Sequence, residues 1–179
     1  MDTSNEIKIQ EEYIKKVKKI NQDKNLKYTI LTMGCQLNEN DSEKLCGMLE
    51  KMGYTKTEKQ NDADLALFNT CCVRENAEDK LFGKLGELKR LKEQKGIIIA
   101  IGGCMMQEKH ITDKIHESYP FVDILFGTHT LHKFPEDLYK VIEEKRKLEE
   151  DRRNFEREKR EFSTHCQLEK DSMKREKQL

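Results

Sequence analysis

The stretch Ile97-Ile-Ile-Ala-Ile101, followed at once by Gly102-Gly-Cys104, indicates the fold class of this chain. Five consecutive apolar residues followed by glycine are typical of a strand buried on both faces, as in a parallel sheet covered by helices. Two similar runs, Tyr28-Thr-Ile-Leu-Thr-Met33 and Leu65-Ala-Leu-Phe68, stand between segments with helical periodicity. This alternation of strands and helices predicts an α/β fold with a parallel sheet.

Periodicity and turn residues place the expected elements more closely. We expect strands over 27–33, 65–70, 97–101 and 122–126, a weak strand from 54, and helices over 6–20, 42–52, 75–95, 105–118 and 135–145. Asp41 or Ser42 is the expected cap of the second helix, and Gly53 its expected end. The result is an open, mostly parallel sheet with flanking helices, Rossmann- or flavodoxin-like. The predicted divisions are an N-terminal amphipathic helix over 1–25, an α/β domain over 26–142 and a charged tail over 143–179.

The tail over 143–179 differs in composition from the rest of the chain. Of its 37 residues 23 are charged, and it contains no glycine or proline. Leu148, Phe155 and Phe162 recur at intervals of seven, but the positions that would complete a heptad seam are charged. The pattern predicts an extended charged helix that is either solvated or pairs with a partner or a second copy as a coiled coil.

Composition narrows the class of protein. The chain has 34 basic and 34 acidic residues, so it has no net charge to attract nucleic acid or a membrane surface. No apolar run approaches the length of a membrane span, and the N-terminus has no secretory signal pattern. Six cysteines without such a signal favour reduced thiols in the cytoplasm over a disulfide framework.

Three cysteines each follow the end of a predicted strand. Cys35, Cys71 and Cys104 come after the runs that end near positions 33, 70 and 101. Because parallel strands end at the same edge of a sheet, and ligands bind there in open α/β sheets, we expect the three thiols to converge. Three thiolates suit a soft metal or an iron–sulfur cluster. One such cysteine alone would usually be a small buried apolar residue, but three at equivalent positions favour ligation.

The other potential ligands fit a metal site less well. Cys46 lies within a predicted helix, Cys166 lies in the charged tail, and Cys72 is adjacent to Cys71, so the two side chains should point apart. The five histidines form no array beside the cysteines, and no Cys-x2-Cys pair of the kind common in structural zinc sites is present. The three widely separated cysteines therefore suit a cluster that has one open iron.

Several short sequence words resemble the N-terminal domain of the tRNA methylthiotransferases, which are radical S-adenosylmethionine enzymes. The similarity is greatest to the branch that makes 2-methylthio-isopentenyl-adenosine beside the tRNA anticodon, and it covers residues 27–145. The resemblance implies that Cys35, Cys71 and Cys104 hold one auxiliary 4Fe–4S cluster, with Cys72 the less suitable member of its pair. The words are Thr32-Met-Gly-Cys-Gln-Leu-Asn38, Asn40-Asp-Ser-Glu43, Asn69-Thr-Cys-Cys-Val-Arg-Glu75 and Gly102-Gly-Cys-Met-Met-Gln107.

The chain departs from that family in one respect. The family's radical domain carries a Cys-x3-Cys-x2-Cys triplet for a second 4Fe–4S cluster that works with S-adenosylmethionine, and no such triplet occurs here. The resemblance therefore implies a fragment that is inactive by itself and that reaches tRNA only through domains absent from these residues. The charged tail has no counterpart in the family pattern.

Two other functions remain open from the sequence. The chain fits a non-enzymatic scaffold or interaction protein whose tail forms a coiled coil. It also fits a thiol-redox or nucleotide-binding flavodoxin-like module, although it has no GxGxxG, P-loop or CxxC motif.

Overall fold

The computed structural model describes residues 3–72 and 76–176, with side chains described for residues 4–72 and 76–167. The chain divides into two compact units, residues 1–141 and 142–179. In order, the elements are α1 (Thr3–Asn21), β1 (Leu26–Met33), α2 (Gln36–Lys51), β2 (Tyr54–Lys56), η1 (Gln60–Asp62), β3 (Leu65–Thr70), α3 (Ala77–Lys95), β4 (Ile98–Gly103), η2 (Cys104–Gln107), α4 (Lys109–Ser118), β5 (Ile124–Phe126), η3 (Thr128–Lys133) and α5 (Phe134–Glu176).

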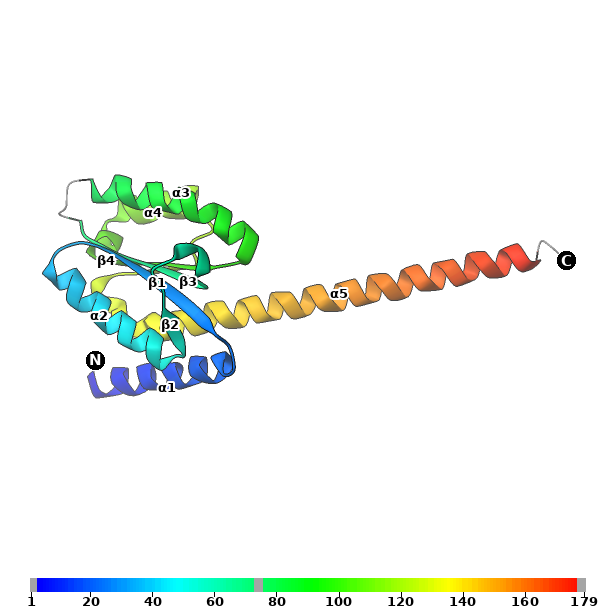
Figure 1. Cartoon of the computed structure of the whole chain (residues 1–179), viewed down its shortest axis with the longest axis horizontal. Helices are drawn as coiled ribbons and strands as arrows, with labels where there is room; N and C mark the ends of the chain where they lie inside the picture. Colours follow the sequence, from blue (N-terminus) through cyan, green and yellow to red (C-terminus); the bar gives the residue numbers. More distant parts are fainter. Residues whose placement is uncertain (1–2, 73–75, 177–179) are drawn as a thin grey trace. The chain divides into compact units, whose positions relative to one another are not determined.

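The first unit is built on one five-stranded sheet. Its strand order is β2-β1-β3-β4-β5, and every neighbouring pair is parallel. All six residues of β3 and all six of β4 are buried, as expected for strands covered on both faces. Helices α3 and α4 lie on one face of the sheet, and α1 and α2 lie on the other (Figure 1). The predicted α/β fold with a parallel sheet is confirmed.

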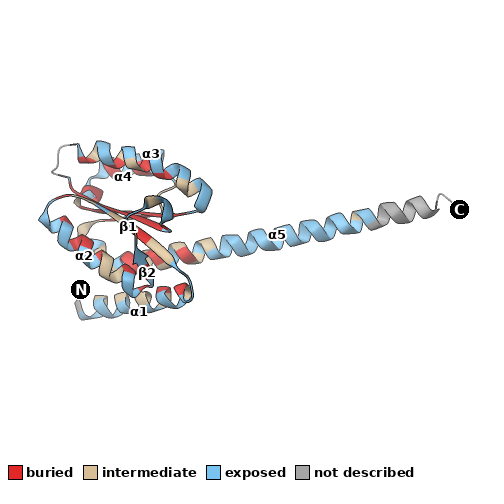
Figure 2. Cartoon of the chain, viewed as in Figure 1, coloured by how far each residue is buried: buried red, intermediate tan, exposed pale blue. Residues whose placement is uncertain are grey.

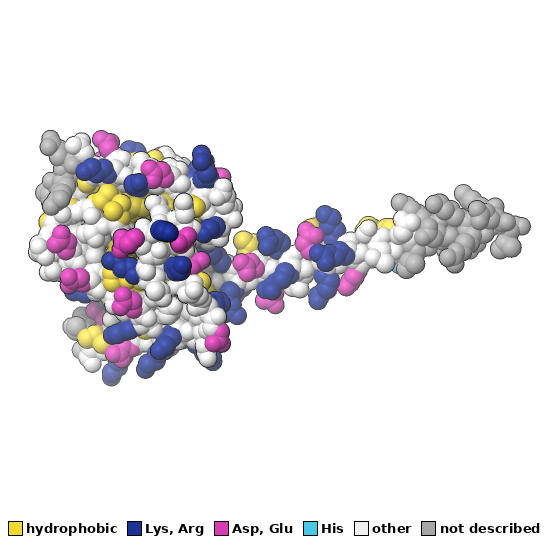
Figure 3. Space-filling model, in the orientation of Figure 1, with side chains coloured by type: hydrophobic (Ala, Val, Ile, Leu, Met, Phe, Trp, Pro, Cys, Tyr) yellow, Lys and Arg dark blue, Asp and Glu magenta, His cyan; other side chains and the backbone are white. Residues whose placement is uncertain are grey.

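The core of this unit consists of two apolar layers, one on each side of the sheet (Figure 2). In each layer a helix face with apolar residues three and four positions apart packs on the apolar strands. One layer includes Leu81, Leu85, Leu88, Ile111 and Ile115. Buried residues outside that cluster include Val17, Leu45, Leu49, Phe134 and Leu138. Acidic and basic side chains are interspersed over the face seen in Figure 3.

Helix α2 begins earlier than its sequence suggested. Its N-cap is Cys35, and the expected caps Asp41 and Ser42 are instead buried inside the helix. Ser42 is accommodated there because its hydroxyl is hydrogen-bonded to that of Thr32, at 2.7 Å. Gly53 has a φ of +91°, so it ends the helix in the expected left-handed conformation. Helix α3 begins at Ala77, and residue 75, its expected start, lies outside the described residues.

Helix α5 runs for 43 residues without interruption, so the expected helix over 135–145 and the charged tail are parts of one element. Pro135 does not break the helix because it lies in the first turn, where a backbone N–H has no partner to lose. In the second unit Leu148, Phe155 and Phe162 are 71%, 64% and 70% exposed. Within the described residues, no helix is long and apolar enough to cross a membrane.

Candidate metal centre at the carboxyl edge of the sheet

The register of the sheet brings the ends of three adjacent strands level. Met33 of β1 is paired with Thr70 of β3, and Thr70 is paired with Gly103 of β4. Cys71 and Cys104 directly follow Thr70 and Gly103, and Cys35 lies two residues beyond Met33. The backbone N–H of Cys71 donates to the carbonyl of Met33 at 3.0 Å, which extends the pairing past the strand ends. The structure therefore brings the three cysteines to one edge of the sheet.

Cys35 lies at the N-terminus of α2. Together with Asn38 it forms a capping box, in which the Asn38 side chain accepts the backbone N–H of Cys35 at 3.2 Å. The backbone N–H groups of Asn38 and Leu37 lower the pKa of the exposed Cys35 thiol, and the neighbouring Cys71 thiol adds to this effect. Lowering the pKa of a thiol raises the fraction present as thiolate, the form that binds metal.

A buried pair of amides connects the loop of Cys35 to the strand of Cys71. The Asn69 side chain donates to the Asn38 carbonyl at 2.7 Å and to the Ser42 hydroxyl at 3.0 Å. The Asn38 side chain donates in turn to the Asn69 side-chain oxygen at 3.1 Å and to the Thr70 carbonyl at 3.2 Å. Asn38 and Asn69 are only 4% and 1% exposed. The two cysteine loops are therefore held together by hydrogen bonds rather than by apolar packing alone.

Cys104 approaches the same group of residues from β4. Gly103 has a φ of +107°, and a Cβ atom there would collide with the backbone carbonyl of Thr70 and the side-chain oxygen of Asn69. Only glycine permits this close approach of β4 to β3. The Cys104 sulfur lies 3.7 Å from the Thr70 carbonyl and accepts the backbone N–H of Cys72 at 3.0 Å. Burial raises the pKa of the Cys104 thiol, and the Cys72 thiol raises it further against the lowering effect of that N–H.

Cys71 occupies the middle of the three positions. It is buried, and its thiol acts on the pKa of both Cys35 and Cys104. Cys72 is exposed, and both its backbone N–H and its thiol interact with Cys104. Its side chain is therefore not turned fully away from the site, as its adjacency to Cys71 had suggested. Of the two adjacent residues, Cys71 is the one whose thiol lowers the pKa of both Cys35 and Cys104.

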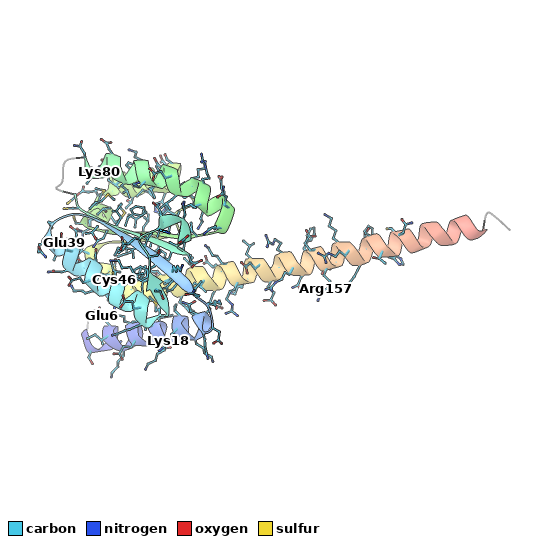
Figure 4. All side chains as sticks on the ribbon, viewed as in Figure 1. Glu6, Lys18, Glu39, Cys46, Lys80 and Arg157 are labelled. Atoms are coloured by element: carbon cyan, nitrogen blue, oxygen red, sulfur yellow. The ribbon has the colours of Figure 1, made fainter. Side chains whose placement is uncertain are left out.

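The remaining candidate ligands lie elsewhere. Cys46 lies further along α2 than Glu39, which is in the first turn of that helix (Figure 4). Cys166 belongs to the second unit. Arg74, which lies close to Cys71 in sequence, is outside the described residues. Among the described residues no three His, Cys, Asp or Glu side chains form a ready arrangement for a single metal ion.

The donor set nevertheless fits an iron–sulfur cluster better than one ion. A cluster is larger than an ion, so its thiolate ligands stand further apart than the ligands of zinc do. The three cysteines come from three separate strand ends, and a helix N-terminus, a glycine with positive φ and the N–H of Cys72 surround them. Backbone N–H groups of this kind stabilise negative charge on sulfur. The sequence predicted that the three cysteines meet at one edge of the sheet, as the strand register shows, and their role as ligands stays a prediction. It did not reveal the Asn38–Asn69 pair, whose signal is a polar residue within the buried run of β3.

Residues 27–127 match the family described as uncharacterized protein family UPF0004, which is more than half of the chain. The chain belongs to this family. The UPF0004 domain is the N-terminal domain of methylthiotransferases, as the resemblance indicated, and it contains all three cysteines of the edge.

Three relatives of this UPF0004 chain share one name. A tRNA-2-methylthio-N(6)-dimethylallyladenosine synthase of Clostridium perfringens is 56% identical over 121 residues, which are 67% of this chain and 27% of that protein. Proteins of the same name from Thermoanaerobacter sp. and Acetivibrio thermocellus are 50% identical over 139 residues and 51% identical over 137, covering 77% and 73% of this chain. These matches span 30% and 28% of the two proteins, so the chain spans less than a third of the relatives' length.

Proposed function

We propose that this UPF0004 domain holds one 4Fe–4S cluster through Cys35, Cys71 and Cys104, as part of a tRNA methylthiotransferase. The observation that carries the proposal is the register of β1, β3 and β4, which brings three thiols from distant parts of the sequence to one edge. Three cysteine ligands leave one iron of a cubane without a protein ligand. When bound, such a cluster supplies an iron to which a sulfur-containing group can attach.

The residues of this chain give each thiol a different environment. The N-terminus of α2 favours the Cys35 thiolate, so this cysteine is the best prepared to bind iron first. Cys104 is held as a thiol by burial, and the N–H of Cys72 stabilises the charge that its sulfur acquires on losing the proton. The Asn38–Asn69 pair keeps the loop of Cys35 beside that of Cys71.

The reaction that we propose is transfer of a methylthio group to isopentenyl-adenosine in tRNA. It rests on the names of the relatives, which match 67% and 77% of this chain. S-adenosylmethionine and a second 4Fe–4S cluster would belong to a radical domain, whose Cys-x3-Cys-x2-Cys triplet does not occur in these 179 residues. The tRNA contacts would be made by domains other than the one described here.

Anaerobic reconstitution with ferrous iron and sulfide tests the cluster. The protein should bind about four irons on the cubane model, with a charge-transfer absorption band that aerobic exposure bleaches. Cys35→Ala, Cys71→Ala and Cys104→Ala should each lose most of the bound iron. The matched controls are Cys46→Ala and Cys166→Ala, which remove a thiol outside the edge and should retain it.

The variant Cys72→Ala decides between the two adjacent thiols. It should retain iron, because the Cys71 thiol acts on the pKa of both other cysteines, whereas the Cys72 thiol acts on that of Cys104. Loss of iron in Cys72→Ala together with retention in Cys71→Ala would reverse the assignment within the pair. Full iron content in all three edge variants would contradict the cluster proposal altogether.

A further inference from the structure

The second unit consists of the described part of α5 beyond residue 142, and its exposed apolar positions form one line along the helix. Leu148, Phe155 and Phe162 are seven residues apart, so they lie on one face after each two turns of helix. Each is at least 64% exposed. Bulky apolar side chains in such a line, on a helix that is otherwise charged, are typical of a contact with another helix.

The charges beside this line are sorted by sign. Around Leu148 and Phe155 the residues three after and four before are acidic, and the residues three before and four after are basic. On the N-terminal side of Phe162, Glu158 and Lys159 continue the acidic row and the basic row. The two rows therefore flank the line on opposite sides of the same helix face. The acidic row is Glu144, Asp151 and Glu158, and the basic row is Lys145, Arg152 and Lys159.

Four residues of the two rows form no ion pair within the part of the chain whose side chains are described. Among the described residues, Asp151, Arg152, Glu158 and Lys159 form no ion pair with a neighbouring side chain, although the ion pair of Arg146 with Glu143 shows that the helix forms such pairs elsewhere. All four side chains are exposed. Both acidic and basic side chains are exposed along the part of α5 coloured by type in Figure 3.

We propose that α5 forms a parallel, in-register homodimer with a second copy of this chain along Leu148, Phe155 and Phe162. In a parallel pair the two-fold axis runs along the helices, so each flank of one helix faces the opposite flank of its partner. The acidic row of one copy then meets the basic row of the other on both sides of the contact. In an antiparallel pair the two-fold axis is perpendicular to the helices, and each row faces its own copy, acid against acid and base against base.

The placement of acidic and basic residues on opposite sides of the apolar line therefore favours a second copy of the chain as the partner and a parallel orientation of the two helices. A second copy of the chain supplies the complementary rows with the same spacing of seven residues, and only the parallel orientation pairs opposite charges. The contact has one apolar position per two turns instead of two, so we expect a weaker association than that of a complete coiled coil. Part of the attraction should be sensitive to salt, because the charged rows lie at the surface.

Charge reversal in the full chain, followed by sedimentation equilibrium, tests the proposal. Reversing the basic row (Lys145→Glu, Arg152→Glu and Lys159→Glu) should give a monomer that remains helical by circular dichroism. Reversing the acidic row (Glu144→Lys, Asp151→Lys and Glu158→Lys) should do the same. An equimolar mixture of the two variants should restore the dimer. The matched control, Arg146→Glu with Arg153→Glu and Arg160→Glu, makes the same change of charge on the opposite face and should still dimerise.

Orientation has a natural reporter in Cys166, which lies four residues after Phe162. In the parallel dimer the two Cys166 thiols lie near each other, and diamide, which accepts two electrons and two protons from the thiol pair, should link them. Cys166→Ser removes this cross-link. In an antiparallel dimer centred on Phe155 each Cys166 lies opposite residue 144, and no cross-link through Cys166 forms. A wild-type chain that stays monomeric, dimers that survive both row reversals, or a dimer without the Cys166 cross-link would overturn the proposal.

Discussion

Replacing Asn69 with alanine tests how much the buried amide pair contributes to the edge of the sheet. The substitution removes three hydrogen bonds, two donated by the Asn69 amide and one accepted from Asn38. The partners are not left alone, because Asn38 still donates to Thr70 and Ser42 remains paired with Thr32. At about 1 kcal/mol net for each bond, and without an orphaned polar group, we expect Asn69→Ala to cost about 2–3 kcal/mol of unfolding free energy.

Urea unfolding of the iron-free protein measures this loss. Since the slope of free energy against urea is about 1–3 kcal/mol per molar for small domains, the unfolding midpoint should fall by about 0.7–3 M while the slope stays constant. The matched control is Asn40→Ala, which changes the same residue type at an exposed position of α2 and should stay within about 0.5 kcal/mol of the wild type.

A double-mutant cycle with Asn38→Ala isolates the contact between the two side chains. The single shared bond, 3.1 Å long, should appear as a coupling energy of about 1 kcal/mol. Strictly additive losses, or a loss below about 0.5 kcal/mol for Asn69→Ala, would refute the view that these amides hold the two loops together.

Three further outcomes are expected. Gly103→Ala should destabilise the first unit and lower its iron content, because φ is +107° and a Cβ would collide with β3. The control is Gly47→Ala, where a Cβ meets nothing. In urea unfolding its free energy of unfolding should be unchanged or higher by up to about 1 kcal/mol. In the iron-free protein iodoacetamide should label Cys35 first, because this thiol is exposed and its pKa is lowered. Labelling of Cys104 should be slower because its pKa is raised, and labelling of Cys71 should be slowest because this thiol is buried. Peptide mass spectrometry at several times shows the order, and faster labelling of Cys71 would contradict it. A protein of these 179 residues, incubated with reductant, S-adenosylmethionine and isopentenylated tRNA, should give no methylthio nucleoside by liquid chromatography, because no Cys-x3-Cys-x2-Cys triplet is present to generate the radical; detection of that nucleoside would show the expectation to be wrong.

Most of the sheet could be predicted from sequence because its strands are short apolar runs between clear turn residues. The continuous run at 97–101 indicated burial on both faces, and β4 is fully buried. The start of α2 could not be predicted by the same reasoning, because cysteine is not a usual cap. Its capping box depends on Asn38, which is held in place by Asn69 from a distant strand. Local pattern cannot reveal a cap that tertiary hydrogen bonds complete.

The candidate site shows the same division. The positions of Cys35, Cys71 and Cys104 after their strands were visible in the sequence, and parallel pairing brings them to one edge. The contact of Cys72 with Cys104 was not visible, because it depends on the backbone turn after β3, where the Cys72 N–H donates to the Cys104 sulfur. Adjacent residues point apart in a regular strand, but this segment follows the strand end.

The adjacency of β1, β3 and β4 also determines which changes of chain length this domain can tolerate. Neighbouring strands lie about 4.8 Å apart, so the separation of the three cysteines is fixed by backbone pairing and not by the lengths of the connecting helices and loops. The segment between Lys56 and Leu65 leads into the amino end of β3. Residues inserted in this segment should therefore leave the separation of the cysteines unchanged. One residue deleted within β3 would shift Cys71 by a position and turn its side chain to the other face. Natural variation in length should therefore concentrate at the amino edge of the sheet, while the short segments that join each strand to its cysteine keep a constant length.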